Sequence, residues 1–359
     1  MSRRQRWGAG LVGAVAAGAI AIGVAVAPGA AAAPQLPPVS PEDLVASVIT
    51  AKPGPMNGTV TVDNELGLPA IPQAPQLGNG SSTVRVWSNG DGKGRVALPS
   101  PDGERTLVSD GTTRWSYDSS DRTATKAPAH PATPQARPDL PGGIDPQTDP
   151  AGAATAMIAD LRKTSTVSVD GTAEVAGRPA YQLVLTPAPS ERTLLREVRV
   201  SVDAEKRLPL QLTVLATGAP QPALTVGFSD LTFGPQDPSL FTFTPPPGTT
   251  VKDAPARGQR GDHGGPPAGA QAPRTVGDGW DRVVIAQRPA TPPNQPGQPG
   301  QPDRPGNAPD LSALGSPVSG PWGQGHLITT AVATAIVTDD GRIAAGAVPE
   351  QVLSEALGR

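Results

Sequence analysis

Apolar and polar residues alternate through four consecutive segments, which read YQLVL (residues 181–185), EVRVSVD (197–203), LPLQLTV (208–214) and ALTVGF (223–228). A period of two is that of a β-strand, because successive side chains of a strand point to opposite faces of its sheet. Short turns such as Ala176-Gly177 and residues 204–207 fit hairpins, and no crossover helices separate the segments. The pattern predicts an antiparallel sheet with one apolar face and one face in water. The predicted apolar face contains Tyr181, Leu183, Leu185, Val198, Val200, Val202, Leu208, Leu210, Leu212, Val214, Leu224, Val226 and Phe228.

Six shorter strand-like runs precede these segments. The dipeptides Asn89-Gly90, Asp102-Gly103 and Asp110-Gly111 lie between such runs, and they readily adopt the positive φ that tight hairpin turns require. This part of the chain is therefore predicted to be an antiparallel meander. Its strands are expected at residues 59–62, 83–88, 94–98, 105–109, 113–118 and 123–126.

Two helices are predicted before the C-terminal part of the chain, and each opens with a capping residue followed by proline. Ser40-Pro41 begins a helix that ends at residues 52–54, and Asp149-Pro150 begins a second one that ends near Lys163. An antiparallel sheet with a wide apolar face needs cover on that face. Two helices could leave a cleft there; alternatively, the helices and the C-terminal part could fill it completely.

Composition and pattern divide the chain into six parts. Residues 1–33 carry three arginines before a Gly/Ala/Val/Ile stretch that ends in four alanines, which is typical of a signal peptide. The alternative for this segment is an uncleaved membrane anchor. The remaining parts are a main domain at 40–253, a Pro/Gly-rich linker at 254–274, a strand of a C-terminal extension at 275–288, a disordered Pro/Gln/Gly linker at 289–310, and a hairpin and closing helix at 311–359 that pack on the main domain.

Composition also excludes several classes of protein. The chain has no cysteine, so it has neither a lipidation site after the apolar segment nor a disulfide framework. Its formal net charge is -3 and it has no basic patch, so nucleic acid is not an expected partner. Arginine far outnumbers lysine in a chain rich in Ala, Gly and Pro, which suggests a GC-rich genome such as that of an actinobacterium.

No motif for catalysis or for metal binding is present. His130, His263 and His326 each lie in sequence that is typical of loops or linkers, and none has a partner at metal-ligand spacing. The chain has no nucleophile elbow, no phosphate-binding glycine loop and no acidic calcium loop. We therefore expect a protein that is not an enzyme, with no catalytic residue, no metal and no cofactor. Trp115 and Tyr117 share one face of a strand, where they are either core residues or part of a ligand cavity.

Residues 110–118 and 241–248 resemble parts of the LolA/RseB-like family. The first segment, from Asp110-Gly111 through Trp115 and Tyr117, is similar to the family's glycine turn and aromatic strand, and the second is similar to the end of its domain. The resemblance covers about 41–253 and implies a mainly β (α+β) fold, an unclosed antiparallel β-barrel with helices across its concave face. Residues 277–280, 321–325 and 338–342 resemble an extension in actinobacterial members. The arginine-bearing motif of the proteobacterial carrier has no counterpart here, so no acyl-release residue is carried over.

The resemblance implies a monomeric protein outside the cytoplasmic membrane that carries acyl chains of lipids or lipoproteins in an apolar cavity. Two alternatives remain: a sensor that regulates a membrane partner such as an anti-sigma factor, or an envelope interaction module without a small ligand. The residues expected to line the cavity are Trp115, Tyr117, Leu183, Leu185, Val198, Val200, Val202, Leu210, Leu212, Val214, Val226 and Phe228.

We expect the mature protein to begin near Ala33 or Pro34, because the run of small residues typical of a cleavage site ends there. N-terminal sequencing of the protein from its own host measures this directly. Recovery of Met1 or Ser2 on a membrane-bound form would instead support the anchored sensor.

Overall fold

The computed structural model describes residues 35–67, 79–129, 148–254, 272–287 and 315–359. The segment predicted to be a signal peptide or an anchor, His130 and His263 lie outside these residues, as does nearly all of both linkers. Among the described residues, no helix has both the length and the apolar character that a membrane crossing requires.

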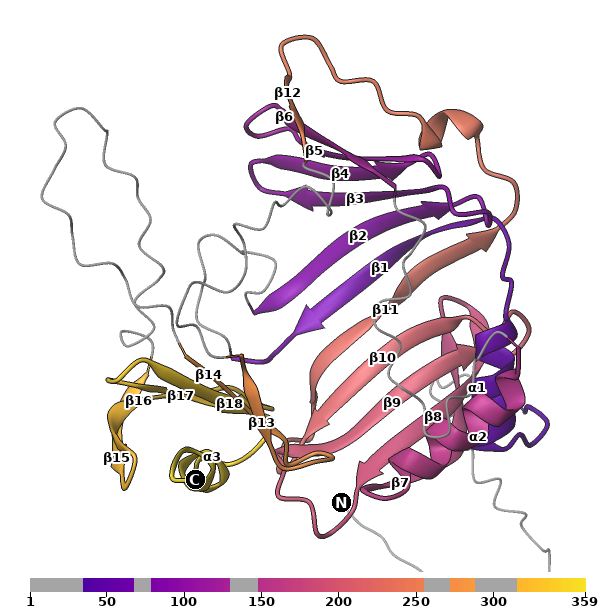
Figure 1. Ribbon diagram of the computed structural model, residues 1–359. Helices are drawn as coiled ribbons and strands as arrows, with labels where there is room; N and C mark the ends of the chain where they lie inside the picture. Colours follow the sequence, from indigo (N-terminus) through magenta and orange to yellow (C-terminus); the bar gives the residue numbers. More distant parts are fainter. Residues whose placement is uncertain (1–34, 68–78, 130–147, 255–271, 288–314) are drawn as a thin grey trace, which may run out of the picture. The chain divides into compact units, whose positions relative to one another are not determined.

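Twelve strands form one large curved sheet (Figure 1). Their order is β12-β6-β5-β4-β3-β2-β1-β11-β10-β9-β8-β7, and every neighbouring pair is antiparallel except β12 with β6. No ladder joins β7 to β12, so the sheet is not closed into a barrel. The strands are β1 (Met56–Asn64), β2 (Gly80–Ser88), β3 (Gly94–Ser100), β4 (Gly103–Ser109), β5 (Thr113–Asp118), β6 (Thr123–Pro128), β7 (Ser165–Val175), β8 (Arg178–Pro187), β9 (Leu195–Asp203), β10 (Pro209–Ala216), β11 (Pro222–Phe233) and β12 (Thr250–Asp253).

Strand β1 joins the two meanders of the large sheet. Strands β2 to β6 follow one another as a meander of hairpins, and β7 to β11 form a second meander. Strand β1 pairs with β2 on one side and with β11 on the other, and its partners on β11 run from Phe233 opposite Met56 to Leu224 opposite Asn64. The predicted mainly β fold with an unclosed antiparallel sheet is therefore confirmed.

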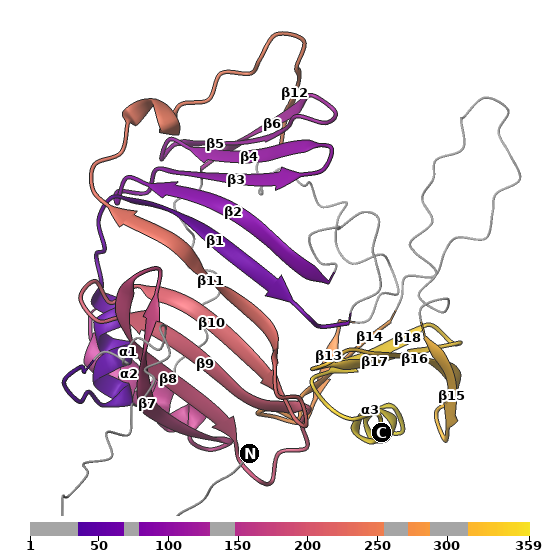
Figure 2. The ribbon, with the colours of Figure 1, turned by 180° about the vertical axis from the view of Figure 1, so that it is seen from behind.

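Both predicted helices are present and lie together across the β7 side of the sheet (Figures 1 and 2). The hydroxyl of Ser40 caps α1 (Pro41–Thr50) by accepting from the Asp43 N–H, and the carboxylate of Asp149 caps α2 (Pro150–Leu161) by accepting from the Gly152 N–H. Leu44 of α1 and Ile158 of α2 are fully buried against β7, β8 and β9. Burial of each of these side chains stabilises the fold by about 1.5–3 kcal/mol.

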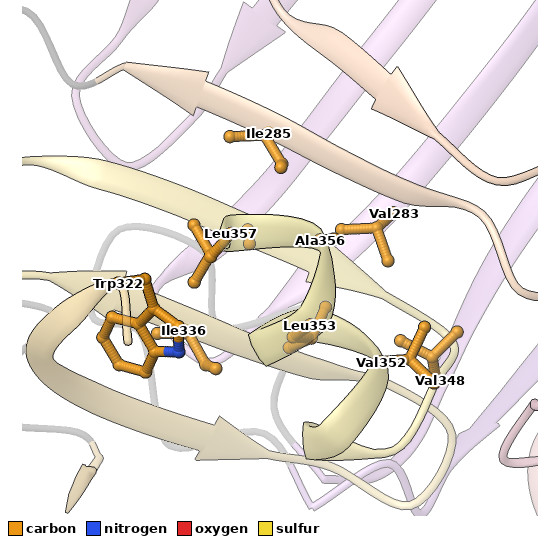
Figure 3. Close-up of a cluster of buried hydrophobic side chains, with 10 residues drawn as sticks. Val283, Ile285, Trp322, Ile336, Val348, Val352, Leu353, Ala356 and Leu357 are labelled. Carbon is orange, nitrogen blue, oxygen red and sulfur yellow. The ribbon is translucent and has the colours of Figure 1, made fainter. Parts of the chain in front are cut away.

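The C-terminal extension forms a sheet of its own with six strands. Its order is β13-β14-β18-β17-β16-β15, so strands from either side of residues 288–314 pair directly, β14 with β18. Helix α3 packs on this sheet and contributes Val352, Leu353, Ala356 and Leu357 to its hydrophobic core (Figure 3). The elements are β13 (Arg274–Val276), β14 (Val283–Gln287), β15 (Ser316–Gly320), β16 (Gly323–Thr329), β17 (Thr334–Thr338), β18 (Arg342–Gly346) and α3 (Glu350–Leu357).

The position of His326 corrects the sequence analysis, which placed all three histidines in loops or linkers. His326 lies within β16, opposite Pro317 of β15 and Val337 of β17. The sequence pattern indicated a loop here because the glycines at 323 and 325 are typical of one. In the structure these glycines lie inside an antiparallel strand, where Gly325 allows close approach to the backbone of β17.

A buried carboxylate fixes the turn between β9 and β10. Asp203 is fully buried and accepts hydrogen bonds from Arg178 on β8 and from the N–H groups of Glu205 and Lys206. Burial raises the pKa of Asp203, but the hydrogen bonds from Arg178 and from the two backbone groups outweigh it, so the pKa lies below its ordinary value of 3.8. The ionised form is therefore part of the folded structure.

We expect Asp203→Ala to lower the free energy of unfolding by about 3 kcal/mol, because it leaves two turn N–H groups without their acceptor and removes the buried carboxylate partner of Arg178, which keeps its contact with Glu205. Since the folded-state pKa is depressed, the contribution of Asp203 is present above pH 3.8 and is lost as the pH falls through the lower folded-state pKa. Urea unfolding at several pH values measures both effects. Asp160→Ala, in an exposed ion pair with Lys163, should cost roughly 0.5 kcal/mol; equal losses would contradict this role of Asp203.

Candidate ligand-binding face

One continuous row of apolar side chains crosses the middle of the large sheet. Directly opposite residues of paired strands place their side chains on the same face. Leu183 pairs with Val200, Val200 with Leu212, Leu212 with Val226, and Val226 with Val62. The row therefore runs over β8, β9, β10, β11 and β1.

Parallel rows widen this apolar face. Leu185, Val198, Val214 and Leu224 form a second row over β8 to β11. Phe228 of β11, Val60 of β1 and Val84 of β2 form a third. We call the three rows together the apolar face.

Beyond the predicted residues, the apolar face continues into the first meander. Val86, Val96 and Leu107 are register partners on β2, β3 and β4, and they share the side of the sheet to which Val84 belongs. None of these residues was predicted to line a ligand site, and neither were Val60 and Val62. Their signal was present as alternation over short runs, such as Val84-Arg85-Val86, but which face joins that of β11 depends on the β1–β11 register.

The two helices cover only part of the apolar face. Beneath α1 and α2, Tyr181, Leu183 and Val202 form a cluster with Leu44 and Ile158, and Val200 and Leu185 lie at its margin. Exposure then rises along the first row, from 9% at Leu183 on β8 to 36% at Leu212 on β10. Leu212 is one of the three large hydrophobic side chains that are exposed in the described part of the chain.

Leu210 departs from the predicted pattern. A register irregularity lies between Pro209 and Gln211, and Leu210 packs in a different cluster with Val175, Ala180 and Leu231. Its side chain is only 2% exposed. Among the site residues predicted on β10, Leu212 and Val214 therefore lie on the apolar face, whereas Leu210 is a core residue.

Trp115 and Tyr117 lie on the opposite side of the sheet from the apolar face. Leu107, which continues the apolar side, pairs with Ser116, so the neighbouring Trp115 and Tyr117 point the other way. Both rings pack on Phe243, at centroid distances of 5.4 and 5.5 Å. Phe243 comes from the segment that follows the short helix η2 (Pro238–Phe241). The structure therefore does not bring the two aromatic residues together with the other predicted cavity residues.

No grouping of side chains suited to a metal occurs within the described residues, where no three His, Asp or Glu residues converge. The polar groups with lowered pKa values are instead turn and ion-pair residues. The Ser120 side chain, for example, holds the pKa of Asp118 below its ordinary value, with Arg105 adding to the effect. The arrangement on the apolar face can exclude water from an apolar ligand, and its rows contain no titratable side chain.

No model of a protein family matches the chain, and no curated protein matches it in sequence. Among solved structures, it is similar to a chain of the MucA/MucB complex of Pseudomonas aeruginosa, with 16% identity and a TM-score of 0.43 over 88% of this chain and 94% of that one. An uncharacterized conserved protein from Thermus thermophilus matches with 10% identity and a TM-score of 0.35, over 59% and 98%. A LolA superfamily protein from Nitrosomonas europaea matches with 12% identity and a TM-score of 0.24, over 57% and 99%.

These likenesses concern the fold alone. The predicted fold class, an unclosed antiparallel sheet with helices on one side, is confirmed in the chain's own architecture. The actinobacterial type of the extension stays a prediction.

We expect Phe243→Ala to lower the free energy of unfolding by about 2 kcal/mol, because the ring packs on both Trp115 and Tyr117. It should also make the fluorescence of Trp115 more accessible to an added quencher. Denaturant unfolding and acrylamide quenching measure the two effects. Val251→Ala, at a side chain that is 49% exposed, is the control and should change neither. Unchanged stability in Phe243→Ala would contradict the packing described for this side of the sheet.

Proposed function

We propose that this protein is a non-enzymatic binder of the cell envelope, which holds the acyl chain of a lipid or lipoprotein against its apolar face. The observation that carries the proposal is the exposure of Leu212, at 36%, in the middle of a row whose β8 end is covered by the helices. An acyl chain lying on Leu212, Val226 and Val62 would remove from water the apolar surface that the helices leave exposed.

Affinity on such a surface needs no charged or catalytic group. Burial of one methylene contributes about 0.8 kcal/mol, so a chain that buries even part of its length gains several kcal/mol. Neighbouring strands lie roughly 4.8 Å apart, and the row from β8 to β1 therefore spans about 19 Å. That length suits an extended chain more than a compact ring system.

Location and oligomeric state belong to the same proposal. The signal-like residues 1–33 support a mature protein outside the cytoplasmic membrane, and a carrier whose apolar face is open to its ligand would act as a monomer. A regulator of a membrane protein and an interaction module without a small ligand remain the alternatives. The interaction module predicts that the isolated protein binds no acyl probe, and the regulator is favoured if residues 1–33 stay as a membrane anchor.

We expect Leu212→Glu to weaken the binding of a fluorescent long-chain fatty acid at least about tenfold, because the bound chain would have to desolvate a carboxylate. The fold should lose little stability, since Leu212 is partly in water. Titration of the probe and thermal unfolding measure the two effects.

The matched control is Thr213→Glu, which places the same charge on the same strand but on the other side of the sheet. It should bind the probe as the wild-type protein does. If the wild-type protein binds neither the probe nor a lipid that co-purifies from its own host, the result contradicts the carrier proposal and supports the alternative functions. Equal loss of binding in both variants would show that the apolar face is not the site.

A further inference from the structure

Arg207 has a backbone conformation that residues with a Cβ atom rarely adopt. It ends the turn between β9 and β10 with a φ of 57°, and its N–H donates to the Asp203 carbonyl at 3.1 Å. The left-handed region is disfavoured for residues other than Gly, Asn and Asp, and glycine is the usual residue there. An arginine at this position therefore costs conformational energy that a glycine would not.

Arg207 is half-buried, and one of its guanidinium nitrogens lacks a hydrogen-bond partner among the described residues. Its Nη1 is buried and has no hydrogen-bond partner in the described part of the chain. The guanidinium lies over the ring of Tyr181, at 5.0 Å from the centroid. A guanidinium carries five N–H donors, and a buried donor without an acceptor is destabilising.

Neighbouring carboxylates are already engaged by other cations. Asp203 binds Arg178 and two backbone N–H groups, and Glu205 pairs with both Arg178, at 3.2 Å, and Lys206, at 3.0 Å. Arg207 forms no ion pair within the described residues. Of the three cations around this turn, it is the one whose charge is not matched by a carboxylate.

Arg207 lies at one end of the apolar face. Tyr181, on which it stacks, belongs to the helix-covered cluster, two residues before Leu183 on the same side of β8. Two residues of a strand span roughly 6.6 Å, so the guanidinium is close to the start of the first apolar row. Leu212 follows Arg207 by five residues along β10, which is roughly 17 Å at most. A cation at one end and exposed apolar side chains at the other suit an amphiphile with an anionic head.

We propose that Arg207 binds the anionic head group of the acyl ligand, through carboxylate or phosphate oxygens that accept from its guanidinium. The inference rests on the proposed function and adds the charge of the ligand to it. A guanidinium presents two parallel N–H donors that match such oxygens, and this accounts for an arginine in place of the glycine that the backbone favours.

The test compares three probes with the same long fluorescent chain: a fatty acid, its uncharged methyl ester, and a phosphate monoester. The wild-type protein should bind at least one of the two anions about tenfold more tightly than the ester. Arg207→Gly should abolish this preference, retain binding of the ester, and keep the thermal stability of the wild-type protein or exceed it, because glycine adopts positive φ without strain.

Arg122→Gly is the matched control, because Arg122 also has a positive φ, of 52°, in a hairpin turn of the other meander. It should leave the preference for an anion unchanged. If Arg207→Gly does not fold, Arg207→Asn serves instead, since asparagine tolerates the same backbone region.

Equal binding of all three probes by the wild-type protein would overturn the role of Arg207 and leave acyl binding intact. A preference for the anion that persists in Arg207→Gly or in Arg207→Asn would also overturn it. Wild-type protein that binds none of the probes would contradict the proposed function and, with it, the role of Arg207. The anionic probe that binds more tightly shows whether the site prefers a carboxylate or a phosphate head group.

Discussion

Two helices of ten and twelve residues have to cover one side of a twelve-stranded sheet, and their length sets the limit of what they bury. A helix rises 1.5 Å per residue, so α1 and α2 are about 15 and 18 Å long. They bury Tyr181, Leu183 and Val202 and leave Leu212 partly in water. Ligand binding on this side would depend on that incomplete cover, because a sheet fully covered here would have no surface left for a ligand.

Different elements cover the two sides of the large sheet. On the side of the apolar face the helices pack over β7 to β9. On the other side, η2, which ends at Phe241, packs against β3 and β4, and Phe243 of the segment that follows packs on the aromatic rings of β5. Ala97, Val108 and Ala124 are buried on that second side. The first meander thus buries these residues on the side away from the apolar face, and its Val84, Val86 and Val96 are left half-buried on the apolar side.

Local signals made much of this fold predictable. Ser40-Pro41 and Asp149-Pro150 predicted both helices because capping and the proline φ act within one turn of the chain. Alternation predicted that Leu183, Val200, Leu212 and Val226 share a face, and the ladders agree. The position of Trp115 relative to Leu212 depends on the register of successive ladders, which no local pattern encodes. The burial of the Arg207 Nη1 and the place of the guanidinium over Tyr181 could not be predicted from the sequence, because both depend on tertiary contacts.

The pairing of β1 with β11 determines how this chain has to fold. Each meander is built from hairpins between neighbours in sequence, which form early because little chain entropy is lost in closing them. The ladder that places Met56 opposite Phe233 closes a loop that contains nearly all of both meanders, and such distant pairings form slowly. Until it forms, β1 and β11 are both open edges with apolar side chains, the state in which sheet proteins associate with one another. The ladder of the large sheet with the greatest sequence separation is thus also the one that completes the first apolar row, since Val62 reaches Val226 only through it.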